Sequence, residues 1–599
     1  MYVPEEICNI CYRCMNTGAL FTAECSHKFH YNCIFSNLQN NNHTCPTCYA
    51  TWTQLHSPFP SSNQTPPPPQ QDGGPMTVKA LPEYPALSKS DQSDSFAALV
   101  SIRAPLLPPE PTVEANSRAP LDLVAILDVS SSMYGHKIAL LKQSLNFVIQ
   151  NLGPADRLSI ITFSTNSQRL TPLTRMTHAG QADTLRVVDS ITAKGTTNII
   201  AGLQTAVKVL EERREKNPVT SIILLSDGQD NANPNFMSCL NRLPQSIRSN
   251  AVGSGLTLSD KIPVYTFGFG SDHDAKALHA ISDGSGGTFS YIEAVEVLQD
   301  AFAQCLGGLL SVVAQDVEIQ LRSGCPDVQI KSIPSGRYKN TIDSFGGQHG
   351  VVYVGDVYAD EEKQFLVYLS VPKAEEKEGE TSTTKLLEVK CLYKNPLTNE
   401  KIESDTAIAE IRRPLKEELT EEDKRVCLEV DREKNRIIIA EGIAEAHEMA
   451  ERGDLFGARS TLRRKREMVM KSFCGMAGDE ATESLSRQAD NVSFGMSSTQ
   501  AYQGGGRAFT LSAQSSHNYQ RAAAQMLQPQ NKNIPGGGDD VKFQTTYMKQ
   551  MMKKSQQQKQ QQQLQQHQQQ RFMSQFKAQN HGFSGTNLVR RGLKLLKKL

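Results

Sequence analysis

The chain has 599 residues, enough for two or three domains, and its 63 Lys and Arg are balanced by 63 Asp and Glu. This balance gives no electrostatic sign of a nucleic-acid partner. No apolar run reaches the roughly 18–20 residues that span a bilayer. The N-terminus also lacks the basic and apolar regions of a signal peptide. We therefore expect an intracellular, cytoplasmic protein without a nucleic-acid partner.

The N-terminal segment is rich in cysteine: seven of the thirteen cysteines lie in the first 48 residues. Six of them form, with two histidines, the series Cys8-x2-Cys11-x13-Cys25-x-His27-x2-His30-x2-Cys33-x11-Cys45-x2-Cys48. Thiolate and imidazole are zinc ligands, and eight of them in so short a segment suit two zinc ions. Cys14 also has ligand spacing from Cys11. We prefer Cys8 with Cys11, because Ile10 then precedes the second ligand as an apolar residue.

This series resembles the two-histidine variant of the RING finger. By this resemblance, one zinc ion is held by Cys8, Cys11, His30 and Cys33, and the other by Cys25, His27, Cys45 and Cys48. A RING finger binds a ubiquitin-conjugating enzyme, and Ile10 and Pro46 match its apolar contact positions. Two residues depart from the usual pattern. Asn37 stands where many such RINGs have Trp, and Tyr49 stands where an Arg often contacts both the enzyme and ubiquitin.

Residues 1–55 form this module, and residues 56–94 form a linker rich in Pro, Ser and Gln. Beyond the linker, short apolar runs alternate with segments of helical periodicity. Leu123–Leu127 is a continuous apolar run, as in a strand buried on both faces, and His136–Leu152 has helical spacing. This alternation over residues 95–311 predicts an α/β domain with a doubly wound, mostly parallel sheet.

Three segments of this domain carry oxygen ligands for a metal ion. Asp128-Val129-Ser130-Ser131-Ser132 follows the first predicted strand, Gly195-Thr196-Thr197-Asn198 opens a helix, and Ser226-Asp227-Gly228 ends another strand. Hydroxyl oxygens with few carboxylates suit Mg²⁺ or Mn²⁺ rather than zinc. Strand ends of this kind are where open α/β sheets bind ligands.

These segments resemble the von Willebrand A domain and its metal-ion-dependent adhesion site. By this resemblance, Ser130, Ser132 and Thr197 contact the metal, while Asp128 and Asp227 do so largely through water. The remaining coordination position accepts a Glu or Asp from a partner. Thr196 is the alternative threonine, and Thr197 is preferred because it lies nearer the start of the helix. The other interpretation is a metal that only stiffens the fold.

The rest of the chain changes character twice. Residues 312–415 alternate with a period of two and predict an antiparallel β-sandwich. Residues 416–475 predict a helical hairpin, and residues 476–599 a disordered, Gln-rich, basic tail. Residues 588–599 are basic and amphipathic. We favour a solvated end there over membrane contact, and the Lys/Arg cluster is a weak nuclear signal.

The order of these modules, with Phe21-Thr22-Ala23-Glu24-Cys25-Ser26-His27, resembles the plant RING/von Willebrand A domain ubiquitin ligases of the wavy-growth family. The resemblance covers residues 5–475. It implies a RING-type E3 ubiquitin transferase that docks a ubiquitin-conjugating enzyme. It also implies that the A domain recruits protein substrates by binding an acidic side chain of the substrate. The alternative is a non-catalytic, zinc-stabilised scaffold that binds acidic motifs through the A domain.

Overall fold

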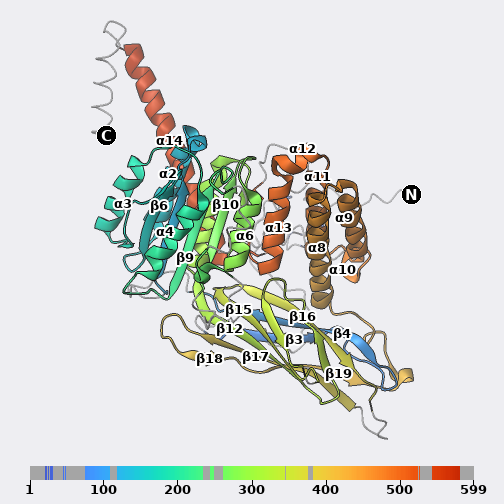
Figure 1. The fold of residues 1–599 in the computed structure, drawn as a ribbon. Helices are drawn as coiled ribbons and strands as arrows, with labels where there is room; N and C mark the ends of the chain where they lie inside the picture. The colour runs from blue at the N-terminus through green and yellow to red at the C-terminus, as the bar shows by residue number, and fades with distance from the viewer. Residues whose placement is uncertain are drawn as a thin grey trace, which may run out of the picture. The chain divides into compact units, whose positions relative to one another are not determined.

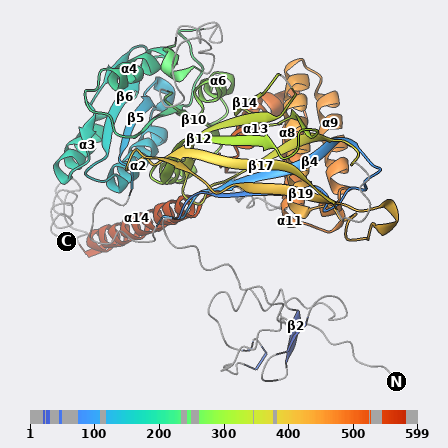
Figure 2. The ribbon, with the colours of Figure 1, turned by 90° about the horizontal axis from the view of Figure 1, so that it is seen from below.

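The computed structural model describes residues 20–22, 25, 27–30, 45, 47–48, 74–107, 118–233, 243–248, 261–344, 346–374, 382–523, 525–526 and 543–579. The chain divides into two units, residues 1–71 and residues 72–599. In the first unit, β1 (Leu20–Thr22) pairs with β2 (Lys28–His30) as an antiparallel hairpin, with Phe21 opposite Phe29. The side chain of Phe29 is fully buried, and β2 is labelled in Figure 2.

The α/β domain of the second unit contains the predicted doubly wound sheet. Its parallel strands are β5 (Leu121–Asp128), β6 (Arg157–Phe163), β9 (Val219–Ser226), β10 (Val264–Phe269) and β11 (Phe289–Ile292), and the sheet order is β20-β11-β10-β9-β5-β6-β7. Short β7 (Ser167–Arg169) and β8 (Thr174–Arg175) pair antiparallel with β6, and β20 (Gln525–Met526) pairs parallel with β11. The fold class predicted for this domain is confirmed.

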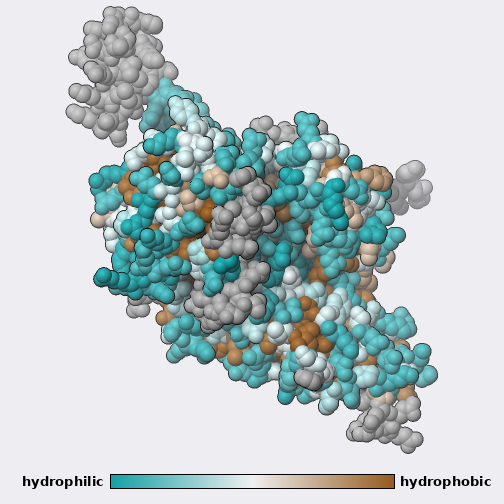
Figure 3. Space-filling view, viewed as in Figure 1, coloured by the Kyte–Doolittle hydropathy of each residue, from teal (hydrophilic) through white to brown (hydrophobic). Residues whose placement is uncertain are grey.

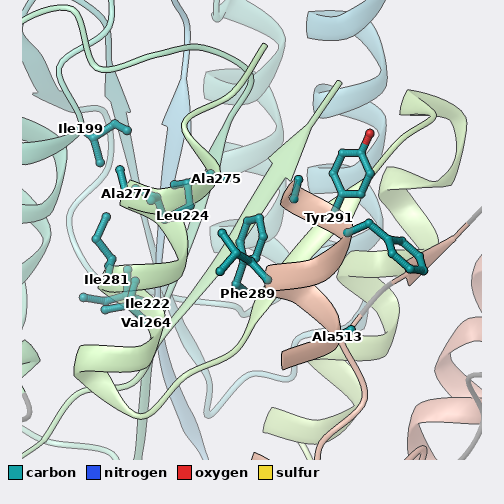
Figure 4. Packing of buried hydrophobic residues seen from close by; sticks show 14 of the residues in the cluster. Ile199, Ile222, Leu224, Val264, Ala275, Ala277, Ile281, Phe289, Tyr291 and Ala513 are labelled. Atoms are coloured by element: carbon teal, nitrogen blue, oxygen red, sulfur yellow. The ribbon is translucent and has the colours of Figure 1, made fainter. Parts of the chain in front are cut away.

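Both faces of this sheet are covered by helices, as Figure 1 shows. The helices are α2 (His136–Asn151), α3 (His178–Ser190), α4 (Ile199–Glu211), α6 (Ala275–Ser285) and α7 (Leu298–Leu309). Alternate residues of β5 enter two separate cores. Val124 and Ile126 pack with α4 and α6, a core drawn in Figure 4, whereas Leu123 and Leu127 pack with α2 and α7. The two cores explain why β5 is a continuous apolar run.

A β-sandwich is built from strands that precede and follow the α/β domain in the sequence. One sheet has the order β14-β15-β12-β17-β18 with β19 beside β17, and the other β13-β16-β4-β3. The strands are β3 (Thr77–Pro82), β4 (Ser93–Arg103), β12 (Val312–Ser323), β13 (Gln329–Ser332), β14 (Lys339–Ile342), β15 (His349–Tyr358), β16 (Glu362–Val371), β17 (Ser382–Lys394), β18 (Lys401–Glu403) and β19 (Ala407–Arg413). The α/β domain is therefore an insertion between β4 and β12.

This insertion corrects two predicted boundaries, the linker over residues 56–94 and the start of the A domain at residue 95. Residues 77–103 instead form β3 and β4 of the sandwich. The cause is the continuous apolar run in β4. Phe96 and Val100 enter the sandwich core, while Ala97 and Leu99 pack with Val430 of α8 (Leu428–Glu451) on the opposite face. A strand buried on both faces has the pattern of a parallel strand in an α/β sheet.

The helices after the sandwich extend beyond the predicted hairpin. That hairpin is α8 with α9 (Leu455–Met470), and Gly453 turns the chain between them with a positive φ of 88°. Further helices follow as α10 (Phe473–Met476), α11 (Glu480–Gly495), α12 (Thr499–Ala501) and α13 (Arg507–Tyr519). Both α11 and α13 pack against α8, and Ala513 of α13 lies in the core drawn in Figure 4.

The tail predicted from residue 476 is corrected accordingly: residues 480–519 belong to the helical layer, and the Gln-rich run lies in α14 (Thr546–Gln579). The core positions of α11 are Leu485, Ala489 and Val492, those of α13 are Ala508, Phe509, Leu511 and Ala513, and the Ser, Gly and Gln residues of this stretch dilute the helical period. Met548 and Met551 of α14 pack into the core beneath α7. Residues 580–599, with the predicted basic end, lie outside the described residues.

A group of buried charges joins the sandwich to the segment that follows α13. Glu361 accepts hydrogen bonds from Lys363 Nζ at 2.7 Å and Arg521 Nε at 2.9 Å. Lys363 Nζ also donates to the backbone oxygen of Tyr519 at 2.7 Å. Burial by itself raises the pKa of Glu361, but the charges of Arg521 and Lys363 hold it below its ordinary value. Burial also lowers the pKa of Lys363 to about 7. We call Glu361, Lys363 and Arg521 the Glu361 cluster.

The first prediction concerns Arg521→Ala, which leaves Glu361 buried without one of its two charged partners. Removing one member of a buried pair costs about 3–5 kcal/mol in the free energy of unfolding. We expect a loss of this size in urea unfolding of the full chain. The control is Arg186→Ala, which removes an exposed pair with Asp183 at 78% exposure of Arg186. It should cost less than about 1 kcal/mol. Equal losses would contradict this role of the Glu361 cluster.

Candidate metal centres

The first unit gathers four predicted zinc ligands. The ligand atoms of Cys25, His27, Cys45 and Cys48 all lie within 4.8 Å of one another. His27 Nδ1 lies 3.4 Å from Cys25 Sγ and 3.7 Å from Cys45 Sγ. A tetrahedral zinc ion with ordinary bond lengths separates a sulfur and a nitrogen ligand by about 3.6 Å. Donor set and spacing therefore both fit zinc, and Nδ1 is the His27 nitrogen that faces the thiolates.

The local fold explains how ligands from two segments meet. The loop of the β1–β2 hairpin carries Cys25 and His27, while Cys45 is buried and Cys48 lies in an exposed turn. This quartet is one of the two ligand sets that the RING resemblance implies. Of the other set, only the backbone of His30 is described. The remaining residues predicted for the RING lie outside the described residues. These are Cys8, Cys11, Cys33, Ile10, Pro46, Asn37 and Tyr49, with the alternative ligand Cys14.

The second centre lies at the carboxyl ends of β5 and β9. Asp128 ends β5 and is fully buried; its Oδ1 accepts the Ser130 N–H at 2.8 Å and its Oδ2 accepts the Ser226 hydroxyl at 2.6 Å. Asp227 follows β9, and its Oδ1 accepts the Ser132 hydroxyl at 2.7 Å. Ser130 Oγ lies 2.9 Å from Ser132 Oγ. Four of the five predicted residues are thus joined by hydrogen bonds at one edge of the sheet.

The fifth residue, Thr197, comes from the start of α4. A Cβ atom on Gly228 would lie 3.3 Å from Thr197 Oγ1 and 3.8 Å from Ser132 Oγ, so both hydroxyls converge on the small space that this glycine leaves. Thr197 is buried, whereas Thr196 is exposed, with its Oγ1 3.1 Å from Thr165 Oγ1. This placement favours Thr197 over Thr196. Two carboxylates and three hydroxyls are donors that fit a hard divalent cation.

The neighbourhood of Asp128 controls its charge. Burial raises the pKa of this carboxyl above its ordinary value, and the nearby charge of Asp227 raises it further. The hydrogen bonds from Ser130 and Ser226 act in the opposite direction. Because a divalent cation stabilises the ionised carboxylate, metal binding would relieve this unfavourable burial.

Sequence reasoning missed two residues of this site. Asp230 accepts the N–H of Ile199 at 3.1 Å and so fixes the start of α4, two residues after Thr197. Lys137, in the first turn of α2, donates from Nζ to Asp227 Oδ2 at 2.5 Å. A signal for Lys137 existed, because a cation in the first turn of a helix is locally unfavourable. Asp230 has no comparable sequence signal, since a lone Asp in a loop is common.

Family models match three parts of the chain. The zinc finger, C3HC4 type (RING finger), matches residues 7–48, and the von Willebrand factor type A domain matches residues 122–304. A third model, described as VWA / Hh protein intein-like, matches residues 479–557, where the structure has α11 to the first part of α14. The second match coincides with the α/β domain and agrees with a domain start after β4. The described residues include no helix long and apolar enough to cross a membrane.

Relatives resemble the chain over most of its length. The E3 ubiquitin-protein ligase WAV3 of Arabidopsis thaliana is 28% identical over 78% of this chain and 72% of its own. The probable E3 ubiquitin-protein ligase WAVH2 of the same organism is 27% identical over 81% and 73%. A solved structure, von Willebrand factor type A from Catenulispora acidiphila, has a TM-score of 0.51 at 18% identity, over 70% of this chain and 89% of its own.

The solved structure supports the fold alone, whereas the family models and the relatives bear on activity. The RING finger implies bound zinc, and its donor quartet is present in the described residues. The predicted resemblance to the plant ligases of the wavy-growth family is confirmed by the relatives named above. The chain is a RING-type E3 ubiquitin transferase that carries a von Willebrand A domain and resembles that family.

Proposed function

We propose that this chain docks a ubiquitin-conjugating enzyme on its RING finger through Ile10 and Pro46 and recruits substrates through the metal site of its A domain. The two classes of partner of an E3 ubiquitin transferase are a ubiquitin-conjugating enzyme and protein substrates. The observation that carries the recruiting role is the convergence of Asp128, Ser132, Thr197 and Asp227 at the edge of the sheet. That edge is where open α/β sheets bind ligands.

The two centres contribute differently. In the RING, thiolate and imidazole ligands satisfy zinc fully, so the ion has a folding role and leaves no free position. In the A domain, Mg²⁺ or Mn²⁺, when bound, supplies a positive centre with a position for a partner carboxylate. The chain's own residues hold that position open: Asp128 is fixed by Ser130 and Ser226, and Gly228 leaves room beside Thr197.

Recruitment by this site needs no large apolar surface on the ligase. The face of the molecule in Figure 3 is mostly hydrophilic, and apolar residues appear on it in small groups. A single metal–carboxylate contact would give orientation and specificity, and surrounding contacts would supply the remaining affinity. We therefore propose substrates that present an exposed Asp or Glu.

The second prediction tests the zinc quartet with His27→Ala and Cys45→Ser. Each change removes one of the four ligands of a single zinc ion, and the module lacks the apolar core to fold without it. Native mass spectrometry should show loss of zinc, and self-ubiquitination with a panel of conjugating enzymes should be abolished. The matched control, Cys325→Ser in the sandwich, should keep both zinc and activity. Full activity with the zinc content unchanged would overturn the assignment of these ligands.

The third prediction tests recruitment with Asp128→Ala combined with Ser130→Ala. The double variant should lose binding of Mn²⁺ and capture of substrates, because two of the five oxygen donors are gone. The melting temperature of the double variant is compared with that of the parent. If the metal is purely structural, its loss lowers the melting temperature of the domain. Ser131→Ala is the matched control, since the Ser131 hydroxyl donates to the Gly195 oxygen instead. Chelators are unsuitable because they also remove zinc. A well-folded double variant that captures the same substrates as the parent would contradict substrate recruitment by this site.

A further inference from the structure

Lys137 is a cation built into the edge of the A-domain metal site. Its Nζ lies 2.5 Å from Asp227 Oδ2 and 5.1 Å from the ring centroid of Phe269. Its side chain is 35% exposed, so it reaches the site from the surface. The residue also occupies the first turn of α2, where the helix dipole disfavours a positive charge. The pairing with Asp227 offsets that local penalty.

The two oxygens of Asp227 are thus divided between two partners. Oδ1 accepts the Ser132 hydroxyl at 2.7 Å on the side of the metal donors, and Oδ2 faces Lys137. With Lys137 present, the site keeps one negative charge in excess, that of Asp128. A divalent cation bound there would leave a net positive charge. Such a centre attracts a further anion, and a carboxylate is an anion that a hard cation coordinates.

We propose that Lys137 is an internal counter-charge that weakens binding of the metal alone and couples tight metal binding to the arrival of a partner carboxylate. Repulsion between the ammonium and the divalent cation lowers the affinity for the ion. A carboxylate in the open position neutralises the excess positive charge and restores that affinity. Because the coupling is reciprocal, the metal raises the affinity for the acidic partner by the same factor. This inference rests on the proposed recruiting role of the site.

The chemistry of lysine suits this role. An ammonium is a compact point charge on a flexible stem and cannot coordinate a metal ion while protonated. Lys137 therefore opposes the cation through charge without adding a donor to the site. A merely structural Lys137 would act through its contact with Phe269 and through the start of α2. The two roles predict opposite effects on metal affinity.

The fourth prediction concerns the affinity of the A-domain site for Mn²⁺ in the full, zinc-loaded chain. The variant is Lys137→Met, because methionine removes the positive charge and keeps an apolar stem. Titration with Mn²⁺ followed by electron paramagnetic resonance should show binding on the order of tenfold tighter than in the parent. Lys137→Arg, the matched control, keeps the charge and should bind Mn²⁺ like the parent. Adding sodium acetate, against sodium chloride at equal ionic strength, should tighten Mn²⁺ binding more in the parent than in Lys137→Met.

Each alternative outcome has a clear meaning. Unchanged or weaker Mn²⁺ binding by Lys137→Met, with an unchanged melting temperature, overturns the counter-charge. If the Met variant melts earlier, Lys137→Gln gives the same test with a polar side chain. An acetate effect of equal size in both proteins overturns the coupling. Failure of the proposed function is distinguished by the Asp128 and Ser130 double variant, which would then capture the same substrates as the parent.

Discussion

The buried carboxylate of Glu361 is the constraint on which the second unit depends. A charge in that position is tolerated only with Arg521 and Lys363 in place, and these three residues come from the sandwich and from the segment after α13. Arg521 also stacks on Tyr358, whose hydroxyl lies 2.6 Å from that of Tyr265 in the A domain. Buried ion pairs contribute little net stability, but a missing partner is costly, so they exclude arrangements in which the parts are shifted. The Glu361 cluster therefore specifies how the sandwich, the A domain and the C-terminal segment meet.

The two metal centres stand in opposite relations to their surroundings. The zinc quartet consists of thiolates and an imidazole on a short hairpin and a turn. The A-domain site lies on a sheet with cores on both faces, and the buried Asp128 already has hydrogen-bond donors for both of its oxygens. We therefore expect the first unit to need zinc in order to fold. In the A domain, by contrast, the packed sheet positions the oxygen donors of the proposed metal site.

Much of the fold followed from sequence because the signals were local. The D-x-S-x-S turn after an apolar run predicted both the sheet edge and the donor set, and the structure joins those residues at one edge. The signals failed where burial depends on distant partners. The run in β4 reads as a strand of the A domain, yet its second face is covered by Val430 of α8. The core residues of α11 and α13 lie in a stretch rich in Ser, Gly and Gln, so their helical period was not separated from the composition of a disordered tail. The position of Lys137 in the first turn of α2 was a local signal, but its partner Asp227 is 90 residues away in the sequence and only the fold places the two together.

The insertion of the A domain between β4 and β12 has a consequence for biosynthesis. β4 pairs with β16, with Arg103 opposite Glu362, so β4 leaves the ribosome long before this second neighbour exists. At about 5–20 residues per second, the roughly 260 residues between them take about 13–50 s to translate. During this interval the A domain emerges with its strands from β5 to β11, while β4 has β3 on one edge and no partner yet for the edge that later pairs with β16. Nascent chains of this protein therefore expose one edge of β4 during this interval, and a chaperone bound near the N-terminus of the second unit would protect that edge until translation passes residue 371.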